Sequence, residues 1–313
     1  MSQTTCRWGI IGSAGIARKN WQAIHNADNA TLVAVASREA SRAAAWIAEN
    51  QADVPIEPAP EAIGGYDVLL ARDDIDAVYI PLPTGLRKEW VIRAAKAGKH
   101  VLCEKPCASS VVDLKEMIGA CDDAGVQFMD GVMFMHSDRM PLLRRVLDDG
   151  KTVGKLKRIA TQFSFGADED FLGENIRTNS MLEPFGSLGD LGWYNIRIAL
   201  WAMNYAMPAR VSGRLLSEAG QSGSSDAVPT EFSGELIWEG GVSAGFYNSF
   251  LTEHQQWVNF SGTKGNIHVQ DYVLPYAGED PSFTSSNAVF EIDGCHFDMV
   301  KKDRLFSIEE APS

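Results

Sequence analysis

The sequence predicts an α/β fold, with a parallel sheet in the first half of the chain and an α+β arrangement with a mostly antiparallel sheet in the second half. Up to Phe134, short apolar segments alternate with segments in which apolar residues have helical spacing, which is typical of successive parallel βαβ units. Beyond Gly150, runs of alternating apolar and polar residues are joined by glycine-containing turns, as in antiparallel sheets. We therefore expect two domains, over residues 1–132 and 133–313.

The composition is that of an ordinary globular protein. Of its 313 residues, 45% are hydrophobic and 22% are charged, and the formal net charge is −13. This charge argues against nucleic acid or an anionic membrane as a partner, because binding to either relies on clustered Lys and Arg. No signal-like or bilayer-length apolar segment is evident, so we expect a cytoplasmic location. Five cysteines without CxxC spacing indicate reduced thiols, with neither a disulfide framework nor a metal site.

The first predicted strand, residues 7–12, ends in a glycine-rich turn that opens a helix. Gly12 would make the tight bend, Ala14 stands where a dinucleotide-binding fingerprint usually has its second glycine, and Ala17 takes the small third position. In that arrangement the pyrophosphate binds the N–H groups that open the helix. A glycine-rich turn without a ligand is the alternative. The candidate cofactor contacts of this turn are Gly12, Ser13, Ala14, Gly15 and Ile16.

The second predicted strand, residues 31–37, ends in Ser37 and Arg38, near the place where this fingerprint reads the adenosine ribose. An acidic residue there would bind the 2′-hydroxyl of NAD, whereas Arg38 offers a guanidinium group. We therefore expect NADP as the cofactor, with NAD possible. The alternative is a solvated cation at the start of a helix, because Ser37 and Ser41 are also residue types that favour such a position.

Two further strands end in proline-containing turns. The strand at residues 77–83 runs into Thr84, and after a helix at residues 87–97 the chain enters a strand that ends in Glu104-Lys105-Pro106. Pro106 lacks an N–H and disfavours the helical region for Lys105, so the strand stops with the lysine at its carboxyl end. Ligands of open parallel sheets bind at that end. The candidate cofactor contacts here are Pro81, Leu82, Thr84, Glu104 and Lys105.

The second half contains a helix-like segment that begins at His136 and Ser137, followed by strands. Aromatic residues on these strands, such as Trp238 and Tyr247, predict a wide sheet face that must be covered. We therefore expect a homodimer or homotetramer that forms through the sheet. The predicted strands are residues 156–165, 232–239, 242–250, 256–262 and 265–271.

A helix that begins at Ser187 carries the candidate catalytic side chains of this half. Asp190 and Tyr194 are four residues apart and so would lie on one helix face. Two alternatives compete with a catalytic role. Ser187 and Asp190 also fit a capping box, in which Asp190 only stabilises the start of the helix. Tyr194 lies in an aromatic-rich helix, where a tyrosine buried in the core is equally expected.

Three segments together, WGIIGSAGIA, YIPLPTGL and EKP, resemble the Gfo/Idh/MocA family of NAD(P)-dependent oxidoreductases. The resemblance covers essentially the whole chain, and EKP is its most specific short motif. It implies a Rossmann domain, followed by a domain with an open, mostly antiparallel sheet that binds substrate and forms the oligomer. It also implies a cis peptide bond between Lys105 and Pro106. Relatives usually continue into a closing helix beyond the point where this chain ends, so this member is short or the sequence is incomplete.

The segment GDLGWY resembles the family's motif in which an acid is followed four residues later by His or Tyr. The tyrosine form, Tyr194, is similar to the branch that contains dihydrodiol dehydrogenase and NADP-dependent xylose dehydrogenases. Residues 133–139 resemble the substrate-side segment of that branch, which makes His136 and Arg139 candidates for substrate binding. The alternative is a helix start with solvated charges.

Hydride transfer requires a group that exchanges the hydroxyl proton of the substrate. A free tyrosine has a pKa of about 10, too high for an efficient base at neutral pH, whereas an ammonium group within ~4–6 Å favours the phenolate. We therefore expect Tyr194 to accept the proton. Lys105 would favour the phenolate and hydrogen-bond the reacting oxygen, and Asp190 would orient the lysine or a substrate hydroxyl. The alternative in which Lys105 itself exchanges the proton stays open.

These expectations combine into an NADP-dependent oxidoreductase that transfers a hydride between nicotinamide and a small-molecule sugar, cyclic polyol or trans-diol. An NAD-linked inositol or sugar dehydrogenase is the nearest alternative, and Arg38 argues against it. The other alternative is a non-catalytic dinucleotide sensor. It is disfavoured because binding alone needs neither Lys105 nor Tyr194.

Overall fold

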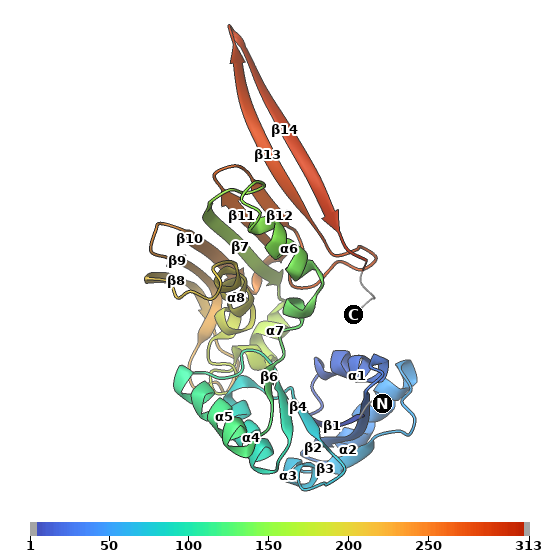
Figure 1. Cartoon of the computed structure of the whole chain (residues 1–313). Coiled ribbons are helices and arrows are strands. Elements are labelled where there is room, and N and C mark those ends of the chain that lie inside the picture. The colour runs from blue at the N-terminus through green and yellow to red at the C-terminus, as the bar shows by residue number, and fades with distance from the viewer. Residues whose placement is uncertain (1–4, 310–313) are drawn as a thin grey trace. The chain divides into compact units, whose positions relative to one another are not determined.

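The computed structural model describes residues 5–309, which fall into two compact units with the boundary between Gly131 and Val132 (Figure 1). Each unit has its own sheet and its own hydrophobic core. No helix within the described range is long and apolar enough to cross a membrane.

Unit 1 is a parallel sheet with helices on both faces. Its strands have the order β3-β2-β1-β4-β5-β6, and all of its strand pairs are parallel. The order reverses between β1 and β4, which is the place where ligands bind in doubly wound sheets. The strands are β1 (Cys6–Ile11), β2 (Ala30–Ser37), β3 (Glu61–Gly64), β4 (Ala77–Ile80), β5 (His100–Cys103) and β6 (Phe128–Asp130). The helices are α1 (Ala17–Asn26), α2 (Ala40–Asp53), α3 (Tyr66–Leu70), α4 (Thr84–Lys96) and α5 (Val111–Ala124).

Neighbouring strand residues of unit 1 face opposite layers. Ile10 of β1 packs in a cluster with Trp21 of α1 and Trp46 of α2. Ile11, the next residue, packs in a second cluster that includes Val91 of α4. Both isoleucines are fully buried, as expected for a strand covered on two sides, whose sequence is apolar throughout rather than alternating.

Unit 2 is a mixed, mostly antiparallel sheet with the order β14-β13-β12-β11-β7-β10-β9-β8. Its one parallel pair among the described residues joins β10 and β7. The strands are β7 (Leu156–Gly166), β8 (Arg210–Ala219), β9 (Val228–Ile237), β10 (Ser243–Ser249), β11 (Leu251–Gly262), β12 (Asn266–Val269), β13 (Ser282–Asp293) and β14 (His296–Ser307). The helices are α6 (Arg139–Leu147), α7 (Glu169–Glu174) and α8 (Trp193–Ala202), with short 3₁₀ turns η1 (Met133–His136) and η2 (Ile176–Thr178) and a π-helix η3 (Leu188–Gly192).

One face of this sheet is covered and the other is open. On the covered face, α8 buries Tyr194 and Ile198 against sheet residues such as Ile159 and Phe260. The open face carries Trp257, Tyr247 and other partly exposed side chains. The predicted combination of a Rossmann sheet with an open, mostly antiparallel sheet is therefore confirmed.

Several elements differ from the sequence-based expectation. The short strand β3 and the strands β8, β13 and β14 were not predicted, and the strand expected at residues 126–134 is limited to Phe128–Asp130. The helix expected to begin at His136 begins at Arg139, because Met133–His136 forms a 3₁₀ turn first. Of the missed strands, β3, β8 and β14 lie at sheet edges. β8 and β14 are exposed over most of their length, so burial does not impose a clear alternation of apolar and polar residues on them.

Candidate functional site

The turn after β1 has the backbone geometry of a phosphate-binding loop. Gly12 has a φ of 113°, a conformation that favours glycine, and its N–H donates to the Ala36 carbonyl at 2.8 Å. A Cβ atom on Gly12 would lie 3.0 Å from Cδ2 of Leu82, so the turn sits tightly against the loop after β4. A Cβ on Gly15 would meet nothing within 4 Å, which leaves open space beside the start of α1. This arrangement suits the approach of a pyrophosphate to the backbone.

The end of β2 places a serine pair and two arginines together. The Ser37 side chain is buried, and its Oγ lies 3.4 Å from Oγ of Ser13. Arg38 is exposed directly after it, and Arg42 follows one helical turn later in α2. Burial raises the pKa of Tyr66, whereas the positive charges of Arg38 and Arg42 act to lower it. Both guanidinium groups therefore lie within electrostatic range of Tyr66. Arg42 was not predicted, although its spacing of four from Arg38 could have revealed it.

Arg87, in α4, forms hydrogen bonds with both the loop after β4 and the loop after β5, at the carboxyl end of the sheet. The side chain is 5% exposed. Its Nε donates to the Leu82 carbonyl at 2.6 Å, and its Nη1 donates to Oγ1 of Thr84 at 2.9 Å and to the Pro106 carbonyl. The loop after β4 and the loop after β5 therefore share one cation. Arg87 was not predicted, since the sequence does not show which loops an arginine in a helix will reach.

Glu104 supports the backbone of Lys105 from the interior. The Lys105–Pro106 peptide bond is cis, as the family resemblance implied. Glu104 is 7% exposed, and its carboxylate accepts from the Tyr79 hydroxyl at 2.7 Å and from the Lys105 N–H at 3.1 Å. Burial, together with the negative charge and hydrogen bond of Glu104, raises the pKa of Tyr79. Tyr79 therefore stays neutral and donates, while the Lys105 side chain remains partly exposed.

The candidate catalytic helix of unit 2 begins with a π-helical turn, and the capping-box alternative is wrong. Ser187 has helical φ and ψ angles of −63° and −31° and makes no capping hydrogen bond. Its hydroxyl instead accepts from the side-chain amide of Asn248 at 2.9 Å. Asp190 is bound by Arg177, whose Nε donates to Oδ2 of Asp190 at 2.6 Å. Asp190 is therefore available for a role other than capping.

Arg177 is a positively charged residue of unit 2 that lies beside Asp190 and Tyr194. The Asp190 carboxylate raises the pKa of Arg177, and Glu183 and Tyr194 act in the same direction. The guanidinium group thus lies within electrostatic range of both Asp190 and Tyr194. It was not predicted from sequence, because it belongs to the short 3₁₀ turn η2, thirteen residues before Asp190.

The ring of Tyr194 is packed in the hydrophobic core of unit 2, whereas its hydroxyl group lies near an exposed residue. The residue is 6% exposed, and its ring packs at centroid distances of 5.4 Å from Phe163 and 6.0 Å from Phe134. Its hydroxyl lies 3.9 Å from Sδ of Met133, a residue that is itself exposed. The ring fits the core-tyrosine alternative, and the position of the hydroxyl keeps the catalytic hypothesis open to test.

The two residues expected on the substrate side have different surroundings. His136 is exposed at the end of η1. Arg139 is 2% exposed and forms an ion pair with Asp271, with 2.6 Å between Nη1 and Oδ1. Its other contacts are the carbonyl oxygens of Asp271 and Ser282. Substrate binding by Arg139 stays a prediction, and its buried ion pair argues against direct contact with a ligand.

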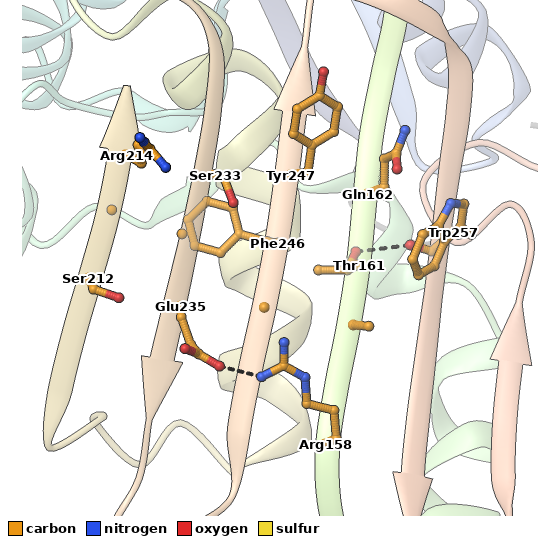
Figure 2. Close-up of a pocket in the computed structure, with 14 residues that line it drawn as sticks. Arg158, Thr161, Gln162, Ser212, Arg214, Ser233, Glu235, Phe246, Tyr247 and Trp257 are labelled. Atoms are coloured by element: carbon orange, nitrogen blue, oxygen red, sulfur yellow. Dashed lines mark hydrogen bonds and ion pairs between the residues drawn. The ribbon is translucent and has the colours of Figure 1, made fainter. Parts of the chain in front are cut away.

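A hollow of about 470 Å³ lies on the open face of the unit 2 sheet (Figure 2). Arg158 crosses over Gly245 of β10 to form an ion pair with Glu235 of β9. Trp257 and Tyr247 also line the hollow. None of the side chains predicted from sequence to be catalytic or cofactor-binding lines it, so this hollow is not the site expected from the motifs.

Comparison with known proteins identifies the family. A family model described as "Oxidoreductase family, NAD-binding Rossmann fold" matches residues 6–132, and a model described as "GFO/IDH/MocA C-terminal domain" matches residues 141–268. The chain belongs to the Gfo/Idh/MocA family. It is an NAD(P)-dependent oxidoreductase, and the resemblance seen in the sequence motifs is confirmed.

Relatives within the Gfo/Idh/MocA family include both kinds of enzyme named for the branch that GDLGWY resembles. The chain is 32% identical over 288 residues to D-xylose 1-dehydrogenase (NADP(+)) 2 from Haloferax volcanii, a match that covers 92% of this chain and 81% of the relative. It is 28% identical over 272 residues to trans-1,2-dihydrobenzene-1,2-diol dehydrogenase from Bos taurus, covering 85% of this chain and 74% of the relative.

A solved structure similar to this chain is a tyrosine-to-phenylalanine variant of a 3-ketoreductase from Actinomadura kijaniata, in complex with TDP-benzene and NADP. The TM-score is 0.78 at 25% identity, and the match covers 95% of this chain and 84% of that one.

Proposed function

We propose that the chain is an NADP-dependent oxidoreductase that transfers a hydride between nicotinamide and a carbinol carbon of a sugar, cyclic polyol or trans-diol. The observation that carries the proposal is the support of Lys105. Buried Arg87 donates a hydrogen bond to the carbonyl of Pro106, and the carboxylate of buried Glu104 accepts one from the N–H of Lys105. The backbone around this lysine is therefore held at the carboxyl end of the sheet, where dinucleotides bind. A protein that only binds a dinucleotide would not need a lysine held in this way.

The unit 1 residues suit a dinucleotide with a 2′-phosphate. The open space beside Gly15 would admit the pyrophosphate, and Arg38 with Arg42 would bind the 2′-phosphate next to Ser37. When bound, the cofactor supplies the hydride acceptor or donor of the reaction. The absence of an acidic side chain at position 38 favours NADP over NAD.

Proton exchange is assigned to Tyr194. In the oxidative direction the substrate C–H bond breaks as a hydride leaves, and the hydroxyl proton passes to the phenolate oxygen of Tyr194, so that a carbonyl forms. Lys105 would donate a hydrogen bond to the reacting oxygen. Asp190, held by Arg177, would orient a substrate hydroxyl.

The test compares Lys105→Met and Tyr194→Phe with the wild type in NADPH binding and in turnover. Binding, followed by nicotinamide fluorescence, should be retained, whereas kcat should fall by at least about 10²-fold. Lys115→Met and Tyr276→Phe change similar side chains on exposed positions and should behave as the wild type. Near-normal turnover in both site variants would remove the assigned roles.

A substrate screen follows the absorbance of the nicotinamide with aldoses, cyclic polyols, trans-diols and nucleotide-linked keto sugars. The last group is included because a similar solved reductase binds a TDP ligand. Turnover of an aldose or diol supports the substrate class proposed, while turnover of nucleotide-linked sugars alone would replace it. NADPH binding without turnover of any of these compounds would favour the dinucleotide sensor.

A further inference from the structure

The turn η2 of unit 2 holds Arg177 on an anchored backbone. The N–H of Arg177 donates to the side-chain carbonyl of Asn175 at 3.1 Å. Thr178, the next residue, is fully buried, and its hydroxyl donates to the Asn175 carbonyl at 2.7 Å. The carbonyl of Thr178 in turn accepts from the N–H of Gln221 at 3.0 Å. The turn is therefore bonded at its start and at its end, which fixes the place from which Arg177 projects.

The guanidinium group of Arg177 has donors that the chain does not use. Its Nε donates to Oδ2 of Asp190 at 2.6 Å, and no hydrogen bond joins its Nη1 or Nη2 to any of residues 5–309. The side chain is 39% exposed, so both amino groups can be reached by a ligand. A guanidinium group has five N–H donors, and the four on these amino groups point along fixed directions in one plane.

Apolar side chains adjoin the two charged residues. Phe185 is 42% exposed, and a Cβ atom on Gly189 would lie 2.9 Å from Cβ of Phe185. Phe185 therefore packs against the π-helical turn that carries Asp190. Ile176, which precedes Arg177 in η2, is also 42% exposed. Apolar side chains beside a few oriented polar groups are typical of sites that bind small molecules.

The charges around the guanidinium group favour a neutral ligand over an anion. The negative charge of Asp190, followed by that of Glu183, raises the pKa of Arg177. A carboxylate or phosphate bound to Arg177 would lie near both of these negative charges and would be repelled. A hydroxyl group both accepts and donates, so it can accept from Arg177 and donate to Asp190 at the same time. The contact between Arg177 and Asp190 is thus suited to a hydroxyl group.

We propose that Arg177 is a substrate-binding residue that, together with Asp190, binds a hydroxyl group on the carbon next to the reacting carbinol carbon. This inference rests on the proposed function, in which Tyr194 exchanges the proton of the reacting hydroxyl. Arg177 lies within electrostatic range of Tyr194, so a hydroxyl bound to Arg177 lies close to the reacting one. Arg177 therefore selects substrates in which two neighbouring carbon atoms carry hydroxyl groups, as in aldoses, cyclic polyols and trans-diols.

The first test measures the preference for the neighbouring hydroxyl as a ratio of kcat/KM values. Suitable pairs are trans-1,2-cyclohexanediol with cyclohexanol, and D-glucose with 2-deoxy-D-glucose. We expect the wild type to prefer the hydroxylated member by about 10²-fold, because the other member loses hydrogen bonds to two charged groups. Arg177→Met should lower this ratio by at least about tenfold. A ratio that Arg177→Met leaves unchanged would overturn the proposal.

The ratio separates substrate binding from other effects of the substitution. Both members of a pair contain the same reacting hydroxyl, so a general loss of activity changes both kcat/KM values and cancels. Arg145→Met, which changes an exposed arginine of α6, is the matched control and should keep the ratio of the wild type. The inference also requires the guanidinium group to lie beside Tyr194. An unchanged pH profile of kcat/KM in Arg177→Met would therefore count against it.

An acidic sugar tests the expected neutrality of the ligand. D-Glucuronate differs from D-glucose by a carboxylate in place of a hydroxymethyl group. We expect D-glucuronate to be used no better than D-glucose, because Asp190 and Glu183 repel an anion at Arg177. A preference for D-glucuronate that disappears in Arg177→Met would show that Arg177 binds an anion, and it would overturn the proposal.

Failure of the proposed function would be recognised separately, as an absence of turnover of every pair by the wild type. Equilibrium binding of the same pairs to the NADP⁺-loaded protein, measured by titration calorimetry, then decides the inference. Tighter binding of the hydroxylated member, with the difference lost in Arg177→Met, supports the role of Arg177. Equal binding of the two members to the wild type would overturn it.

Discussion

Tyr194 has its ring in the core of unit 2 and its hydroxyl near exposed Met133. The sequence presented the core and catalytic interpretations as alternatives, and the structure shows that one side chain has features of both. A similar point holds for Glu104, which was predicted as a cofactor contact. Its buried carboxylate accepts a hydrogen bond from the backbone N–H of Lys105. A direct contact of Glu104 with the cofactor stays a prediction.

Arg177 is predicted to act as a positioning residue for Asp190 and Tyr194. Arg177→Met removes a cation that favours a nearby phenolate, so the acid limb of the pH profile of kcat/KM should move to higher pH and kcat should fall on the order of tenfold. Arg177→Lys keeps the charge and should restore the position of the limb. A loss of activity with an unchanged pH profile in Arg177→Met would indicate a purely structural role.

Arg38 and Arg42 are predicted to select NADP. Each charged contact with a 2′-phosphate contributes about 1.5–3 kcal/mol, so Arg38→Ala or Arg42→Ala should raise KM for NADPH by at least about tenfold and leave KM for NADH little changed. Arg93→Ala, which removes an exposed arginine of α4, serves as the control. Equal changes for NADPH and NADH would show that the two arginines do not read the phosphate.

At the level of elements, Arg87 joins the loops after β4 and β5 by hydrogen bonds to their carbonyl oxygens. Arg139 joins α6 to the segment after β12 through its ion pair with Asp271. The helical spacing of apolar residues predicted α4 and the existence of a helix near residue 139. It could not predict where these arginines would point. Their acceptors are backbone carbonyls and a carboxylate that come from other elements, and such pairings arise only when the chain is folded.

The buried ion pair of Arg139 and Asp271 gives a prediction for stability. Both side chains are 2% exposed. Removing one partner leaves the other charge buried and unpaired, so Arg139→Met should lower the free energy of unfolding by about 3–5 kcal/mol. Denaturant titration of the variant measures this difference.

The double variant Arg139→Met/Asp271→Asn should recover part of the loss, because no unpaired charge remains buried. Urea midpoints of the single and double variants, fitted with the same slope, provide the comparison. A stability of Arg139→Met within about 0.5 kcal/mol of the wild type would contradict a structural role.

At the level of the whole molecule, the chain consists of two units with different sheets, and each carries part of the candidate chemistry. Lys105 and the residues expected to bind the dinucleotide belong to unit 1, whereas Asp190, Arg177 and Tyr194 belong to unit 2. The paired strands β13 and β14 add an exposed surface that the sequence had not indicated.

The sequence by itself determined the parallel sheet, the bend at Gly12, the lysine at the end of β5 and the family. These features depend on local patterns: a glycine with positive φ, a proline that ends a strand, and a strand–helix alternation. Only the tertiary structure decided the partners of Asp190, Arg87 and Arg139, and the amphipathic ribbon of β13 and β14. Arg139 and Asp271 are 132 residues apart, and no local spacing relates them. The apolar face of the ribbon becomes visible only when the register pairs Ile292 with Phe297 and Phe290 with Met299.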